Sequence, residues 1–69
     1  MTVSEKERGI LDGVAAGLSN QAIATAVGYK NGQVVKNRLR QLCKRIRKEL
    51  GMEVENRVQV ARLVWEKRI

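Results

Sequence analysis

One stretch, residues 33–50, constrains this chain more than any other. Read as a helix, it collects its apolar side chains into one stripe at a spacing of about 3.6 residues per turn. The stripe contains Val35, Leu39, Leu42, Cys43, Ile46 and Leu50. The opposite sector, roughly 100° wide, contains Gln33, Lys36, Asn37, Arg40, Lys44 and Arg47, with Arg38 and Arg45 at its flanks. The pattern predicts a helix with one side for a core and the other for a polyanion.

The charge of this helix is one-sided, because no acid interrupts it before Glu49. A charged face is most often simply solvated, but solvated faces normally mix both signs to limit repulsion. The chain carries a net charge of +7, and residues 29–48 contain eight Lys and Arg with no Asp or Glu. We therefore expect an acidic partner, of which nucleic acid is the commonest.

Size and composition exclude several classes of protein. The 69 residues predict a single domain, 1–69, close to the lower size limit for a stable core, so a dimer would help. With no histidine and one cysteine, neither a zinc site nor a common nucleophile and base can be assembled, so we expect no enzyme, metal or cofactor.

Because Cys43 lies on the apolar stripe of the long helix, we expect its thiol to be buried and structural. No run resembles a membrane span or signal sequence, so we expect a cytoplasmic protein without a small-molecule ligand.

The N-terminal half predicts two short helices. Ser4 and Glu7 form a capping box that starts the first helix, and Gly17 is placed to end it in the left-handed conformation. Its apolar side contains Ile10, Leu11, Val14, Ala15 and Leu18. Gly9 and Gly13, four residues apart, either allow another helix to approach closely or are simply tolerated.

Ser19 can cap the second helix, and Gly28 ends it after barely two turns. Its inward side is predicted to contain Ala22, Ile23, Ala26 and Val27. A helix this short needs packing partners, as the first helix of a helix-turn-helix does. In the link 28–32, Asn31 is the candidate cap of the long helix, and Tyr29 is expected to fill the corner with its ring.

In the C-terminal part, Gly51 is predicted to end the long helix and residues 52–55 to form a loop. A last helix is predicted from about residue 56 to residue 67. Its apolar residues divide between two sides. One side contains Val58, Ala61, Trp65 and Ile69, and the other contains Val60, Leu63 and Val64. We interpret the second side as a self-association surface; the alternative is that both sides enter one wide core.

Together these motifs resemble the LuxR/GerE-type DNA-binding domain, an all-α, four-helix helix-turn-helix module, from Val3 to about Trp65. Residues 15–24, AAGLSNQAIA, resemble the family signature AAGLSNKEIA, and residues 35–39, VKNRL, resemble VKNHL at the start of its recognition helix. The pairs 50–51 and 56–57, LG and NR, resemble its closing motifs.

The chain also departs from the family pattern. The link after Gly28 is one residue longer, the long helix is longer by about one turn, and the loop before Asn56 is longer by about two residues. Val34 stands where a threonine is common, and Ala22 and Gln59 replace acidic residues. The apolar stripe stays in phase despite these differences, so we expect the fold to be kept. They bear instead on the dimer geometry that the last helix carries in the family.

The resemblance implies that Lys36, Asn37 and Arg40 read bases in the major groove, and helical geometry places the same three on the basic side. Asn37 can pair with adenine and Arg40 with guanine, and Gln33 can add a contact. The expected phosphate contacts are Lys30, Arg38, Lys44, Arg45 and Arg47, together with the amides near Ser19 and Asn20.

The sequence therefore predicts a transcription regulator that binds specific double-stranded DNA as a homodimer on an inverted repeat, associated with the bacterial nucleoid when bound. Met1 suggests that the chain is complete and acts as a stand-alone regulator. The alternative is an interaction module similar to sigma-factor region 4, acting mainly through RNA polymerase or another regulator. RNA binding ranks third, because Tyr29 and Trp65 are the only aromatic residues and Trp65 is expected to be buried.

Overall fold

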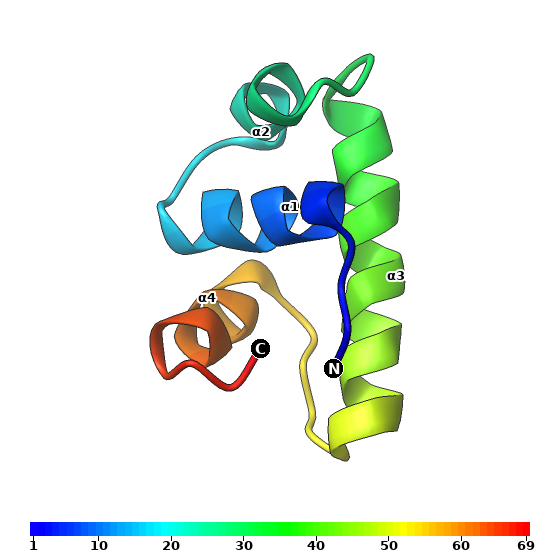
Figure 1. Ribbon diagram of the computed structural model, residues 1–69, viewed down its shortest axis with the longest axis vertical. Helices are drawn as coiled ribbons and strands as arrows, with labels where there is room; N and C mark the ends of the chain where they lie inside the picture. The colour runs from blue at the N-terminus through cyan, green and yellow to red at the C-terminus, as the bar shows by residue number, and fades with distance from the viewer.

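The computed structural model describes the whole chain, residues 1–69, as four helices without strands (Figure 1). The helices are α1 (Glu5–Ala15), α2 (Asn20–Val27), α3 (Gly32–Leu50) and α4 (Arg57–Trp65). At about 1.5 Å per residue, α3 is roughly 28 Å long and accounts for most of the longest dimension, 31 Å. It forms one edge of the molecule, with α1 and α2 meeting it crosswise and α4 packed mainly against α1.

The helix ends follow the predicted local signals. The Ser4 hydroxyl accepts a hydrogen bond from the Glu7 backbone N–H at 3.1 Å, and the Glu7 carboxylate accepts one from the Ser4 N–H at 2.8 Å. The side chains of Ser19 and Asn31 likewise cap α2 and α3. Gly17, Gly28 and Gly51 all have positive φ, as their predicted helix-ending roles require.

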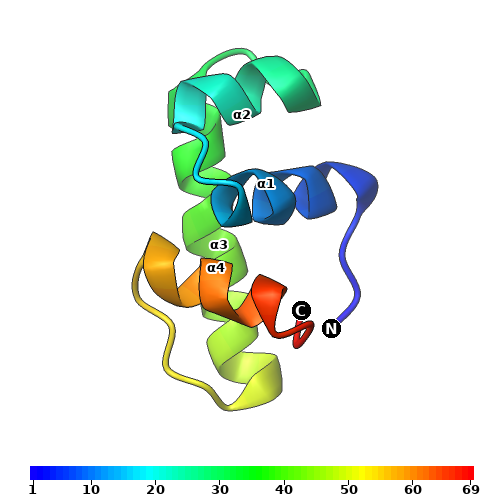
Figure 2. The same cartoon turned by 90° about the vertical axis from the view of Figure 1, so that its left-hand side faces the viewer.

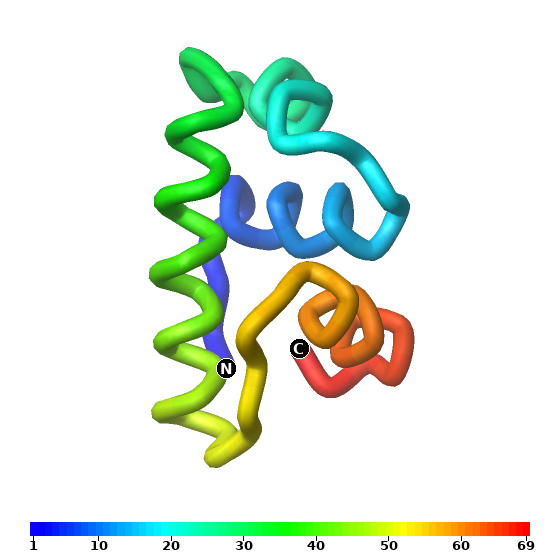
Figure 3. Tube along the Cα trace, turned by 180° about the vertical axis from the view of Figure 1, so that it is seen from behind, coloured from blue at the N-terminus to red at the C-terminus, as the bar shows by residue number.

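The apolar stripe of α3 is the centre of the core. Val35, Leu39, Leu42, Cys43 and Ile46 are buried, and Leu50 is half-buried at the edge. Side chains from α1, including Ile10 and Leu11, complete the cluster. Figure 3 shows that the N-terminal segment and the segment after α3 both run alongside this helix.

Close packing of α1 on α2 explains the two glycines of α1. A Cβ on Gly13 would lie 2.6 Å from Cγ1 of Ile23, and a Cβ on Gly9 would lie 2.8 Å from Cγ2 of Val27. These distances are shorter than van der Waals contact, so a larger residue at either position would require Ile23 or Val27, or the helices themselves, to shift. Of the two interpretations left open by the sequence, close approach is confirmed.

The inward side of α2 differs from the prediction. Ile23 and Ala24 are buried and Val27 is half-buried, whereas Ala22 and Ala26 are exposed. The reason is that α2 turns Ile23 and Val27 toward the glycines of α1. These two contacts set its rotation.

The orientation of α4 overturns the predicted self-association surface. Val60 and Leu63 are only 0% and 4% exposed, and Val64 is half-buried against the core. Because α4 packs on α1, Val60 and Leu63 face inward and are not available as a free surface, and Val64 is only partly accessible. Trp65, expected to be buried, is 65% exposed, and Val58 is 69% exposed.

Two further details of the C-terminal part were not foreseen. Val54, in the loop before α4, is buried and helps to close the core. Lys67 takes the left-handed conformation at φ 57°, so α4 ends at Trp65, two residues before the predicted end. None of the four helices is both long enough and apolar enough to cross a membrane.

Candidate nucleic-acid interface

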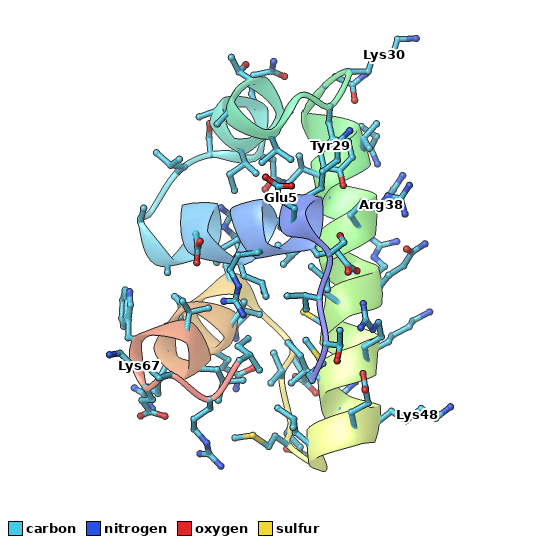
Figure 4. All side chains as sticks on the ribbon, viewed as in Figure 1. Glu5, Tyr29, Lys30, Arg38, Lys48 and Lys67 are labelled. Carbon is cyan, nitrogen blue, oxygen red and sulfur yellow. The ribbon has the colours of Figure 1, made fainter.

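The outward side of α3 is the most strongly charged surface of the protein. The predicted residues Gln33, Lys36, Asn37, Arg40, Lys44 and Arg47 are all exposed there. Figure 4 shows that the labelled side chains Lys30, Arg38 and Lys48 also project away from the other three helices. The structure therefore brings together, along one edge, most of the side chains that the sequence predicted for DNA contact.

Four cations follow each other on this side at intervals of four residues: Lys36, Arg40, Lys44 and Lys48. Residues four apart are neighbours on a helix surface, and like charges in that relation cost about 0.2–0.5 kcal/mol per pair. None of the four has an ion pair or a hydrogen bond from its side chain within the protein. We call this set the cationic row. Its repulsion is not relieved internally, so an external anion would relieve it.

Lys48 was not among the predicted contact residues. It extends the cationic row by one turn beyond Lys44, toward the end of α3. The spacing of four residues was present in the sequence and is the signal that would have identified it.

Gln33 and Asn37 form an amide pair beside the cationic row. Gln33 Nε2 donates a hydrogen bond to Asn37 Oδ1 at 3.2 Å, and both residues are exposed. The pair leaves the Asn37 amide N–H groups and the Gln33 oxygen free. One donor and one acceptor thus lie side by side, the pattern that complements the adenine edge in the major groove.

Arg45, predicted to contact phosphate, makes several contacts within the fold. It is half-buried, and its guanidinium donates to Glu7 Oε2 at 2.6 Å and to the Thr2 carbonyl at 2.5 Å. Its Nε also lies 3.6 Å from Glu49. The helical wheel put Arg45 at the flank of the basic side, but packing of α1 and the N-terminal segment covers that flank.

The Glu7 carboxylate is stabilised in its charged form. The hydrogen bond from the Ser4 backbone N–H, followed by the contact with Arg45, lowers the pKa of Glu7 below its ordinary value despite partial desolvation. Both contacts favour the ionised form of Glu7, and its pairing with Arg45 joins α1 to α3 at this point.

Arg47 and Arg57 also hold segments of the chain. Arg47 is exposed, but its Nη1 donates to the Val54 carbonyl at 2.6 Å and so fastens the loop before α4. Arg57 donates to the Asn20 side chain and, at 2.5 Å, to the Leu18 carbonyl. The Arg47 guanidinium, predicted to contact phosphate, therefore makes a hydrogen bond within the fold; the predicted contact from the amides near Ser19 and Asn20 does not involve the Asn20 side chain.

The first turns of α2 and α3 lie in contact. Gly32 N–H donates to Gln21 Oε1 at 3.1 Å, and a Cβ on Gly32 would lie 3.1 Å from the Gln21 nitrogen. The Ser19 hydroxyl is taken by the Ala22 N–H at 3.1 Å. The partial positive charges of two helix N-termini thus add to the cations of α3 at this end.

No group of three or more His, Cys, Asp or Glu side chains is placed to hold a metal ion. Burial raises the pKa of Cys43, so its thiol is held in the neutral form. Comparison of the chain with protein-family models, with curated protein sequences and with solved structures found no match.

Proposed function

We propose that this protein is a transcription regulator that binds specific sequences of double-stranded DNA, with α3 in the major groove. The observation that carries the proposal is the cationic row, four neighbouring cations on an exposed helix with no internal partner. A B-DNA major groove, about 12 Å wide, admits one helix. Phosphates on both sides of the groove would neutralise the charges that the protein leaves unpaired.

In this proposal α2, the turn 28–31 and α3 act as a helix-turn-helix of the LuxR/GerE type. Arg40 and the Gln33–Asn37 pair read base edges, with Lys36 beside them. Lys44 and Lys48 lie about 12 and 18 Å along the helix from Lys36 at ~1.5 Å per residue, so they meet phosphates as the groove curves away. Lys30 and Arg38 contact the backbone from the flanks.

Homodimerisation on an inverted repeat stays a prediction. A dimer would have to use a surface other than the predicted one, because Val60 and Leu63 are buried in the core. The alternative function, an interaction module that acts through RNA polymerase or another regulator, is favoured by a different observation. Val58 and Trp65 of α4 are large apolar side chains exposed to solvent.

The test is selection from randomised duplex DNA at about physiological salt, where non-specific attraction to phosphate is weak. The proposal expects enrichment of a defined sequence. An inverted repeat would indicate a dimer, and a single half-site a monomer. Binding that persists only at low salt, without any enriched sequence, would contradict the proposal and favour the interaction module.

Single substitutions test which side chains contact DNA. Arg40→Ala is expected to relax the preference at one base pair by about 1–3 kcal/mol. Arg62→Ala is the matched control, because Arg62 is an exposed and unpaired cation on α4 and not on α3. Equal effects of the two substitutions would show that only net charge matters.

A further inference from the structure

The buried side chains of α3 determine which of its other side chains point straight away from the core. At about 100° per residue, the five buried residues of its stripe centre on one direction, and the opposite direction passes through Asn37. Figure 2, seen from the side opposite to α3, shows α1 and α4 in front of that helix. The side of α3 on which Asn37 lies therefore faces away from the other helices.

The residues closest to this outward direction change in type along α3. Within roughly 50° of it, the first half of the helix presents only amides and the second half only lysines. They are Gln33, Asn37 and Gln41, followed by Lys44 and Lys48. We call Gln33, Asn37 and Gln41 the amide row.

Local helix stability does not explain the amide row. Solvated helix faces are normally built from charged residues of both signs, which keep a protein soluble. Asn ranks below Lys, Glu and Gln in helix propensity, yet Asn37 stands inside α3 at the centre of its outward side. What these uncharged side chains can contact is the better explanation of their position.

Gln41 is the free member of the amide row. Its side chain is exposed and makes no hydrogen bond within the protein, whereas Gln33 donates to Asn37 at 3.2 Å. The Gln41 amide therefore offers both its N–H donors and its oxygen to a ligand. Gln41 lies one turn beyond Asn37, about 6 Å along the helix at ~1.5 Å per residue. That distance is close to two base-pair steps of about 3.4 Å each.

Cations on both flanks of the amide row fit the two walls of a DNA groove. Lys36 and Arg38 each lie about 100° from the outward direction, on opposite sides of it. An α-helix with its side chains is about 10–12 Å across, and the B-DNA major groove is about 12 Å wide. With the amide row toward the base pairs, charged side chains meet the phosphates of both walls and uncharged amides meet the bases.

We propose that Gln41 reads a second adenine, so that the DNA site contains two A·T pairs about two base pairs apart. The Gln33–Asn37 pair reads the first adenine. At the second, the Gln41 oxygen accepts a hydrogen bond from adenine N6, and its N–H donates one to N7. This inference rests on the proposed DNA binding and adds a residue that determines its sequence specificity.

The test compares the sequences that wild type, Gln41→Ala and Gln41→Glu select from randomised duplex DNA at about physiological salt. The wild type is expected to enrich both A·T pairs. Gln41→Ala should lose the preference at the second pair alone, by between about fivefold and a hundredfold. Gln41→Glu should prefer cytosine there in place of adenine, because a carboxylate accepts a hydrogen bond from cytosine N4. Gln59→Ala, which removes an exposed amide from α4, is the control.

A change in the DNA alone gives a second measurement. In the selected site, the adenine of the second pair is replaced by an analogue with C–H in place of N7, which cannot accept a hydrogen bond from Gln41. The wild type is expected to bind this duplex at least about fivefold less tightly, and Gln41→Ala to bind both duplexes equally. A folding defect cannot produce the wild-type result, and circular dichroism verifies that each variant is helical.

Three results would overturn the proposal. They are a Gln41→Ala selection with unchanged preferences, a loss of Gln41→Ala affinity that is equal on all sequences, and equal wild-type binding to adenine and its analogue. In each case the wild type still selects a defined sequence, so the proposed function stands. Failure of the wild type to enrich any sequence would instead overturn both proposals.

Discussion

Arg45 Nη1 lies 2.6 Å from Oε2 of Glu7, and this ion pair joins the C-terminal half of α3 to the first turn of α1. The same guanidinium reaches the Thr2 carbonyl, so one side chain holds both α1 and the N-terminal segment in place. Its neighbour Lys44 is exposed and unpaired. Of these two adjacent cations, only Arg45 is engaged within the fold.

The first prediction compares these neighbours. Arg45→Ala is expected to lower the free energy of unfolding by about 1–2 kcal/mol, because it removes a part-buried ion pair and a charged hydrogen bond. For a domain of this size that is a loss of roughly 4–16 °C in Tm. Lys44→Ala should leave Tm almost unchanged. Thermal denaturation measures both, and equal Tm values would contradict the structural role of Arg45.

The second prediction concerns pH. The pKa of Glu7 is lowered in the folded state, so its stabilisation is present above the ordinary value of 4.5 and is lost as the pH falls through the folded pKa. The wild type should therefore be more stable than Glu7→Gln at pH 7, and the difference should shrink in acid. Melting curves of both proteins from pH 7 to about pH 3 test this. A difference independent of pH would show that the charge of Glu7 is unimportant.

The third prediction concerns the close contact between α1 and α2. Gly13→Ala gains about 1 kcal/mol of helix propensity, but its Cβ would lie 2.6 Å from Cγ1 of Ile23. Because Ile23 is fully buried, overpacking of about 1–3 kcal/mol is expected to exceed the gain. Asp12→Ala, on the exposed side of α1, is the control in urea denaturation. A more stable Gly13→Ala would mean that α2 can shift freely.

The fourth prediction concerns salt. Lys44→Ala and Lys48→Ala should each weaken DNA binding about equally on all sequences and reduce the slope of log K against log salt by about 1, because each removes one phosphate contact. Arg62→Ala should change neither quantity, since Arg62 lies on α4. Fluorescence anisotropy at several salt concentrations gives the slopes. If the slope of log K against log salt were unchanged in both lysine variants, Lys44 and Lys48 would not contact phosphate.

The fifth prediction concerns the amide pair. If Gln33 holds Asn37 as their 3.2 Å hydrogen bond indicates, the two alanine substitutions will not be additive. The coupling free energy in a double-mutant cycle of DNA binding is expected at about 0.5–3 kcal/mol. The cycle for Gln33 and Lys48, about 22 Å apart along α3 at ~1.5 Å per residue, provides the additive reference. Additivity in both cycles would mean that each amide acts alone.

The local signals in the sequence predicted the helices well. Caps such as Ser4 and Asn31 and the glycines at 17, 28 and 51 act on backbone groups within a few residues, so their effects do not depend on the remainder of the fold. The stripe of α3 was also predictable, because its two sides differ so strongly that only one can be buried.

The tertiary structure decided which side chains are buried where the local pattern allowed two alternatives. The last helix is apolar on two sides, and only its packing on α1 determined that Val60 and Leu63 are buried while Val58 and Trp65 face solvent. Arg45 lies at the border of the basic side, where its role depends on Glu7, 38 residues away. The sequence by itself determined the four helices and the charge of α3, since these follow from neighbouring residues. Which borderline side chains became free surface was decided by contacts between distant segments.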